Sequence, residues 1–230
     1  MHLYPVEKSV ISLNSLLEVD DLSSTTTFLD WGGNQGNLLS FDNFPIERSN
    51  YTCVDVDEDA LNIGAIVYPE ANFIHYNRFN KVYNQSGNPD EAFPTIDTNQ
   101  DIIFAFSVFT HTDFNEFKET VLWMKDTFTY RKIIISLIGT NSTILLNRFY
   151  NARVEREGSS IDIRDLANEP DTNIAYLTDN NTIIRNQMGA DGVTCQTFLT
   201  MYDTSFVLEQ LGGTIQIVHD LEYPFLVIEP

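Results

Sequence analysis

The sequence predicts an α/β fold: a mostly parallel sheet covered by helices on both faces, with an antiparallel hairpin at its C-terminal end. Three observations predict it. Short apolar runs alternate with helix-like segments in the first half of the chain, a glycine-rich turn follows the first run, and two strand-like runs joined by a short turn come last. Strand alternating with helix is typical of βαβ units and of a parallel sheet. We expect a single domain over residues 1–230.

Five strands are expected in the first part of the chain. Each is a short run rich in apolar and β-branched residues, and the fourth is apolar on both faces, as a central parallel strand is. In chain order they cover 26–30, 51–55, 72–76, 101–106 and 132–137. Helices are expected over 58–67, with Asp57 as N-cap, and over 113–128, where apolar residues recur at helical spacing.

The C-terminal part follows a different order. A helix over 204–211 ends at two glycines, and strands are expected over 214–218 and 224–228. Their connection is too short for a parallel crossover, so the pair is expected to be antiparallel. Residues 1–25 are interpreted as an N-terminal cap segment. The weakly patterned ranges 77–100 and 140–195 are interpreted as loops or insertions on the substrate side.

Charge and composition exclude several classes of protein. The net charge is −20, with 13 Lys and Arg against 33 Asp and Glu, and no basic cluster occurs, which disfavours binding to nucleic acid. No apolar run is long enough to cross a bilayer, and the start lacks a secretory signal pattern. Cys53 and Cys195 are too far apart to indicate a metal site or a disulfide framework. We therefore expect a cytoplasmic protein with no membrane partner and no metal.

The strongest local signal is the glycine-rich turn Asp30-Trp31-Gly32-Gly33-Asn34-Gln35-Gly36 after the first strand. Such a turn lets backbone amides approach a ligand closely. The glycine spacing fits the dinucleotide fingerprint poorly, and no P-loop lysine is present. An acidic residue at the strand end would suit a cationic ligand better than a pyrophosphate.

A second signal is Asp55, which lies nineteen residues beyond Gly36 at the end of the second expected strand. A carboxylate there can accept hydrogen bonds from both hydroxyls of a ribose. Together with the acidic residue before the glycine turn, Asp55 indicates an adenosine ligand without phosphate.

At these residues the chain resembles the class I SAM-dependent methyltransferases, where SAM is S-adenosyl-L-methionine. The resemblance rests on the glycine turn, on Val54-Asp55-Val56-Asp57 and on the run from Asp101 to His111, in the family's order, and extends from about 28 to 137. It implies a Rossmann-like, seven-stranded sheet, SAM as cofactor and S-adenosyl-L-homocysteine (SAH) as product. One departure is Asn34, where the family usually has glycine. Asn tolerates left-handed backbone angles, so a variant turn is expected.

The resemblance also implies a role for each matching position. Residues of the turn would surround the methionyl end, Asp55 would hold the ribose and Val56 would pack on the adenine. Asn77 would meet the adenine amine, and the residues after the fourth strand would line the floor near the sulfonium. The cofactor set is Asp30, Gly32, Gly33, Asn34, Gly36, Asp55, Val56, Asn77, Phe106 and Ser107.

The acceptor side is predicted from position and composition. His111 follows the fourth strand at the carboxyl edge of the sheet, where ligands bind, and is the candidate catalytic base; the alternative is a histidine that caps the next helix. The segment 76–84 mixes aromatic and amide side chains, which suits either a recognition loop or an ordinary surface loop. The candidate substrate-binding residues are Arg78, Tyr83, Asn84, Thr110, His111 and Tyr202.

The predicted function is transfer of a methyl group to an O or N atom of a small metabolite, sugar or natural-product acceptor, including a peptide acceptor. Three alternatives stay open. The first is a catalytically inactive SAM-fold protein that binds or regulates. The second is a metal-dependent sugar transferase, based on the acidic run 55–59. The third is an NAD-dependent oxidoreductase, which the glycine spacing disfavours.

Overall fold

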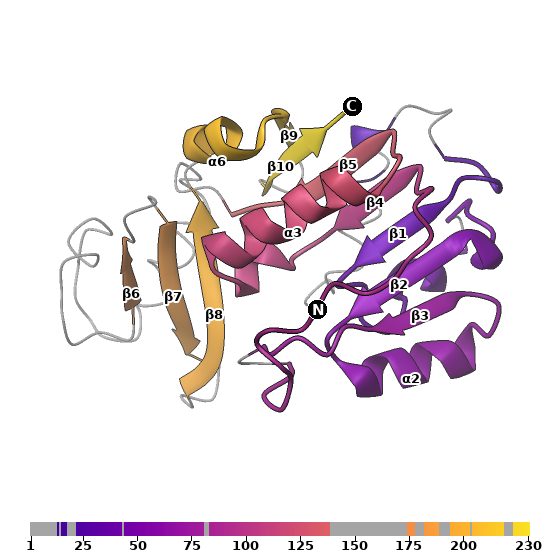
Figure 1. Ribbon diagram of the computed structural model, residues 1–230, viewed down its shortest axis with the longest axis horizontal. Helices are drawn as coiled ribbons and strands as arrows, with labels where there is room; N and C mark the ends of the chain where they lie inside the picture. The colour runs from indigo at the N-terminus through magenta and orange to yellow at the C-terminus, as the bar shows by residue number, and fades with distance from the viewer. Residues whose placement is uncertain are drawn as a thin grey trace.

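The computed structural model contains a seven-stranded sheet in the order β3-β2-β1-β4-β5-β10-β9 (Figure 1). The structure describes residues 13, 15–17, 22–42, 44–80, 83–138, 174–177, 182–188, 194–202, 204–218 and 223–230. Most of the cap segment 1–25 and most of the range 140–195 therefore lie outside the described residues.

Five strands of this sheet are parallel. They are β1 (Phe28–Trp31), β2 (Tyr51–Asp55), β3 (Asn72–His75), β4 (Ile102–Ala105) and β5 (Lys132–Ser136). The last strand, β10 (Tyr223–Ile228), runs antiparallel both to β5 and to β9 (Thr214–Val218). The order and directions confirm the predicted fold class, a mostly parallel seven-stranded sheet with an antiparallel C-terminal hairpin.

Helices cover both faces of the sheet. On one face, α3 (Phe114–Thr127) and α6 (Thr204–Leu211) pack in the same apolar cluster as Leu29 and Ile103. On the other face, α2 (Glu58–Val67) contributes Leu61 to a cluster with Phe28 and Phe104. Asp57 and Asp113 cap α2 and α3, each accepting a hydrogen bond from a backbone amide of the first turn.

The chain after the glycine turn forms the 3-10 turn η1 (Asn37–Ser40) and not a longer helix. Asp42 and Pro45 follow closely, and both disfavour a helix interior. Two further 3-10 turns are η2 (Arg48–Asn50) and η3 (Phe109–His111). None of the helices in the described part of the chain is long and apolar enough to span a bilayer.

A second, antiparallel sheet consists of β6 (Ile174–Leu177), β7 (Thr182–Met188) and β8 (Thr194–Tyr202). Its strands were not expected individually, and they lie largely in the range 140–195, which was interpreted as loops or insertions. These runs mix polar and apolar residues and show no clean alternation, which hides them from a periodicity search. The sheet lies beside the N-terminal end of α3, and β8 contacts η3 (Figure 1).

Candidate active site

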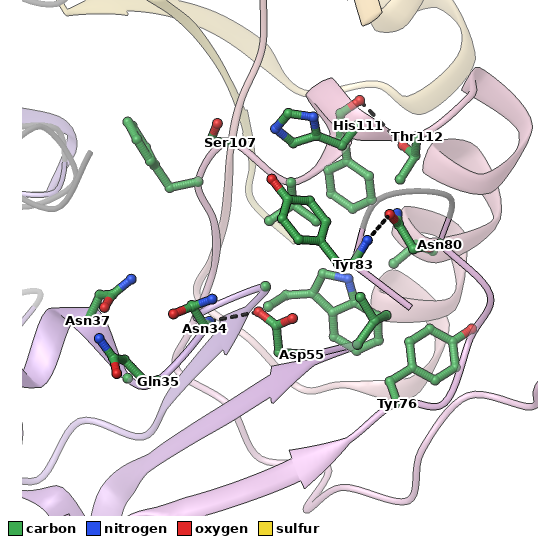
Figure 2. A pocket seen from close by; sticks show the side chains of 18 of the residues that line it. Asn34, Gln35, Asn37, Asp55, Tyr76, Asn80, Tyr83, Ser107, His111 and Thr112 are labelled. Carbon is green, nitrogen blue, oxygen red and sulfur yellow. Dashed lines mark hydrogen bonds between the residues drawn. The ribbon is translucent and has the colours of Figure 1, made fainter. Parts of the chain in front are cut away.

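A cavity of about 710 Å³ opens at the carboxyl ends of β1, β2 and β4. Its walls are the glycine turn, the residues after β2, the loop after β3, the segment after β4 and the first turns of α3. Figure 2 shows the polar side chains around it, with Asn34 beside Asp55, and with Tyr83 and His111 on the same pocket. Crevices at this edge of open α/β sheets are the usual ligand sites.

The glycine turn contributes the backbone of Gly32 and Gly36 to the cavity lining, beside the side chains of Asn34, Gln35 and Asn37. Gly32 has φ +76°, and a Cβ there would lie 2.3 Å from a methyl carbon of Val108. Gly36 has φ +75°, and its Cβ would lie 3.0 Å from the ring of Phe73. Both glycines line the cavity. Any side chain at Gly32 would therefore collide with the opposite wall, which explains the residue type.

Asn34 adopts the left-handed backbone conformation expected of a residue that replaces glycine in this turn. Its φ is +56°, a left-handed conformation that asparagine adopts more readily than most residues. Its backbone N–H donates to Oδ2 of Asp55 over 2.7 Å. The turn and the end of β2 are thus joined by one short hydrogen bond between two cavity-lining residues.

Asp55 is held in place by backbone groups alone among the described residues. Its Oδ1 accepts from the N–H of Asp57 over 2.9 Å, in addition to the bond from Asn34. Burial raises the pKa of Asp55, and these amide hydrogen bonds oppose that rise. A carboxylate has about four lone-pair sites, so two amide bonds leave acceptor capacity for hydroxyl donors in the cavity.

Asp30 lies beneath the turn and is absent from the cavity wall. The Tyr51 hydroxyl donates to its Oδ2, and a Cβ on Gly33 would lie 2.5 Å from the same oxygen. Burial raises the pKa of Asp30 to about 7, with Tyr51 opposing the rise. Asp30 and Gly33 thus meet each other under the turn, while Gly32, Asn34 and Gly36 line the cavity.

The segment after β4 supplies the wall opposite the glycine turn. Phe106 and Ser107 line the cavity, as does Val56 after β2. Ser107 has φ +61°, which is unusual for a residue with a Cβ, and its N–H donates to Oγ of Ser136 over 2.6 Å. This bond ties the strained residue to the neighbouring strand β5, so the backbone here is fixed before any ligand binds.

His111 lines the cavity at the end of η3, and its ring meets that of Tyr83 edge-on at 5.7 Å between centroids. The N-cap of α3 is Asp113, so the capping position is filled by another residue. Thr110 lies outside the cavity lining, and its hydroxyl donates to the Ser107 carbonyl over 3.0 Å.

Tyr202 also lies outside the cavity lining and is fully buried. Its hydroxyl bonds to the carbonyl oxygens of Phe109, over 2.6 Å, and of Thr112, over 3.3 Å. Tyr202 therefore links the end of β8 to the short segment that carries His111, and acts on the cavity through that segment.

Some predicted residues of the loop after β3 line the cavity, and others make hydrogen bonds within the loop or to its neighbours. Tyr83 lines the cavity. Asn77, Arg78 and Asn84 lie outside the lining, and Nδ2 of Asn84 donates to Oδ1 of Asn77 over 3.1 Å. The Arg78 guanidinium donates to the Glu91 carbonyl over 3.1 Å, and it pairs with Glu119 on α3 over 3.3 Å.

Several cavity residues were missed by sequence reasoning. On α3 and just before it, Thr112, Glu116 and Thr120 line the cavity at four-residue spacing. Glu116 and Thr120 are four residues apart on α3 and lie on one helix face, but that spacing does not tell this face from the others, so the sequence gives no signal for them. Trp31 and Tyr76 also line the cavity, and they belong to an aromatic cluster in which their ring centroids are 5.4 Å apart.

Glu116 is the second carboxylate of the cavity lining, after Asp55. Burial, and next the neighbouring charge of Asp113, raise its pKa to about 7. Within the described residues, no cluster of His, Cys, Asp and Glu has the arrangement of a metal site.

No protein-family model matches the chain, and no characterised protein matches it by sequence. Solved structures do match its fold. CalS10, an amino pentose methyltransferase from Micromonospora echinaspora with bound SAM, has a TM-score of 0.56 at 9% identity, over 98% of this chain and 91% of its own. The glycopeptide N-methyltransferase MtfA with SAM has a TM-score of 0.54 at 9% identity, over 100% and 96%.

A third structure, the DhpI–SAM–HEP complex, has a TM-score of 0.53 at 10% identity, over 100% of this chain and 89% of its own. The chain thus has the fold of the class I SAM-dependent methyltransferases, as its motifs predicted.

Proposed function

We propose that this protein is a SAM-dependent methyltransferase and that the cavity at the carboxyl edge of the sheet holds SAM and the methyl acceptor. The observation that carries the proposal is the pairing of a side-chain-free turn at Gly32 and Gly36 with the amide-held carboxylate of Asp55. At Gly32 and Gly36 a Cβ would meet Val108 or Phe73, so the backbone itself forms the cavity surface there, and Asp55 keeps acceptor capacity for ribose hydroxyls. The fold shared with structures that contain SAM supports the same assignment.

The residues divide the work of holding the cofactor. Asp55 would accept hydrogen bonds from the ribose, Val56 would pack on the adenine, and the turn would surround the methionyl end. Phe106 and Ser107 would form the floor near the sulfonium. When bound, SAM supplies a methyl carbon activated by positive sulfur, so the protein has to align the acceptor and exclude water.

His111 is the residue we propose as proton acceptor for an O or N nucleophile of a small metabolite, sugar, natural-product or peptide acceptor. It lines the cavity on the side of η3, and Tyr83 contacts its ring. With an acceptor found by screening, His111→Gln should lower kcat by about 10²- to 10⁴-fold at unchanged SAH affinity. An unchanged kcat would remove His111 from the reaction.

The cofactor assignment is tested by calorimetric titration of the protein with SAM and SAH, and with NADH for comparison. We expect Kd values in the micromolar range for SAM and SAH and no heat from NADH. Asp55→Asn should weaken SAH binding by about 100-fold, since it disturbs two amide bonds and the proposed ribose contact. Asp59→Asn is the matched control, because Asp59 is exposed on α2 and carries the same charge.

Two outcomes would contradict the assignment. If NADH binds and SAM does not, the oxidoreductase alternative replaces it. If Asp55→Asn and Asp59→Asn bind SAH equally well, the cofactor lies elsewhere in the molecule.

A further inference from the structure

The cavity lining has carboxyl groups at two separate places. Asp55 lies on the side of the glycine turn, and Glu116 projects from α3. Among the described residues that line the cavity, none is Lys or Arg. Arg78, whose charge acts on Glu116, lies outside the lining and is held by Glu119 and by the Glu91 carbonyl. An acceptor that carries phosphate or carboxylate would meet no Lys or Arg among these lining residues.

Glu116 is set up to bind a donor. Within the described chain, no group donates a hydrogen bond to its carboxylate, while its backbone N–H and carbonyl are occupied by Asp113 and Thr120. A partly buried carboxylate without a donor gains most from a charge-assisted hydrogen bond, which is about twice as strong as a neutral one.

The same part of the cavity is lined with aromatic rings. Trp31, Tyr76 and Tyr83 all contribute to the lining, and Trp31 and Tyr76 contact each other. Aromatic faces attract cations, most strongly where water is excluded. A carboxylate combined with aromatic walls is the arrangement that recognises an ammonium group.

We propose that the acceptor of this proposed methyltransferase is an amine, and that the Glu116 carboxylate binds it in its ammonium form against the rings of Trp31 and Tyr76. The ammonium would give one proton to His111, so that the nitrogen lone pair could take the methyl group while the bond from that carbon to sulfur breaks and SAH leaves. The inference rests on the proposed function, and it names the substrate class for the same site. Thr120, one turn after Glu116 on α3, also lines the cavity; its hydroxyl donates to the Glu116 carbonyl and can still accept a hydrogen bond from a polar group next to the amine.

The test measures binding, by ligand-detected NMR, to the protein saturated with SAH. Benzylamine, benzyl alcohol and benzoate are the probes, because they match in shape and differ in charge. We expect benzylamine to bind about tenfold more tightly than benzyl alcohol, and benzoate least of all. Glu116→Gln should abolish this preference. Asp126→Asn, the same charge change at an exposed position of α3, should keep it.

The dependence on pH gives a second readout that a structural role for Glu116 would not produce. The charges that face Glu116 are Asp113 and Glu119 on α3 and Arg78 in the loop after β3, and Tyr76 is the further titratable neighbour. Because the pKa of Glu116 is about 7, benzylamine affinity should rise between pH 6 and pH 8 as the carboxyl ionises. That rise should be absent in Glu116→Gln.

The amino group that Glu116 recognises could instead be that of the adenine ring of the cofactor. Measuring SAH binding to Glu116→Gln distinguishes the adenine amine from an acceptor amine. We expect Glu116→Gln to bind SAH within about threefold of the wild type, and S-inosylhomocysteine to be discriminated equally by both proteins. A tenfold loss of SAH affinity, with loss of that discrimination, would overturn the acceptor assignment in favour of adenine. Equal binding of benzylamine and benzyl alcohol to the wild type would also overturn it. Failure of the wild type to bind SAH at all would refute the proposed function instead.

Discussion

The two ends of the cavity differ in the groups that form their walls: glycine backbone and a carboxylate held by amides at one end, side chains at the other. At the proposed cofactor end, Gly32 and Gly36 present no side chain, and Asp55 accepts hydrogen bonds from two backbone amides. At the proposed acceptor end, side chains of α3, η3 and the loop after β3 form the wall, among them Glu116 and Tyr83. Under the proposed function, the first end would be a fixed cofactor site, and the specificity of the second could change by single substitutions.

The same difference decides what the sequence could predict. The turn glycines and Asp55 follow strands that are visible as apolar runs, so their place at the carboxyl edge is predictable from neighbours in the chain. Glu116 looks like any polar residue of an amphipathic helix. Only the packing of α3 against the sheet shows which of its faces meets the cavity.

Asn77 was predicted to meet the adenine amine, but in the structure its neighbour Tyr76 lines the cavity and Asn77 does not. The N–H of Tyr76 bonds to the Asp55 carbonyl over 2.9 Å, which extends the pairing of β2 with β3 by one residue. Tyr76 therefore faces the cavity, and the N–H of Arg78 bonds back to the Tyr76 carbonyl over 2.6 Å, which leaves Asn77 in a tight turn. Side chains alternate along a strand, so its exact last residue decides which one lines the site.

More of the fold than of the site could be predicted from the sequence. The strands and helices of the large sheet follow from periodicity and capping residues such as Asp57 and Asp113. The sheet β6-β7-β8 could not be predicted, because its pairing is non-local and its strands carry weak alternation.

The largest effect is expected from Gly32→Ala, which changes the glycine turn at the proposed cofactor end. The new Cβ would lie 2.3 Å from a Val108 methyl at φ +76°, so we expect SAH binding to be lost and the protein to be destabilised by about 2–4 kcal/mol. Gly212→Ala is the control, because it has φ +73° with nothing within 4 Å of its Cβ. Urea unfolding and SAH titration check both variants. Equal effects would show that strain, and not the collision with Val108, accounts for the loss.

A smaller effect on stability is expected from Asp30→Asn, which tests the buried carboxyl group that lies under the glycine turn. The pKa of Asp30 is raised from 3.8 to about 7, so the folded state binds more protons than the unfolded state in this range. Wild-type stability should therefore fall as pH rises through it. Between pH 5 and pH 8, the free energy of unfolding of Asp30→Asn should gain about 2–3 kcal/mol relative to the wild type. Parallel pH curves from urea unfolding would contradict the raised pKa.

The smallest effect is expected from Tyr202→Phe, which acts on the acceptor end alone. Losing the hydroxyl removes a buried hydrogen bond of 2.6 Å to the Phe109 carbonyl, which keeps its longer bonds from Thr112, and the contact with the Thr112 carbonyl, at a cost of about 1–2 kcal/mol in stability. SAH affinity should stay within twofold of the wild type, since the cofactor end is held by the large sheet. Tyr130→Phe, at a partly exposed position, should change neither quantity. A loss of SAH affinity in Tyr202→Phe would show that the two ends are coupled through η3.

The most direct test of the central claim is calorimetric titration of SAH into the wild type, Asp55→Asn and Glu116→Gln. A cavity with separate cofactor and acceptor ends predicts micromolar binding to the wild type and to Glu116→Gln, and about 100-fold weaker binding to Asp55→Asn. Absence of binding to the wild type, or equal loss in both variants, would contradict that division of the cavity.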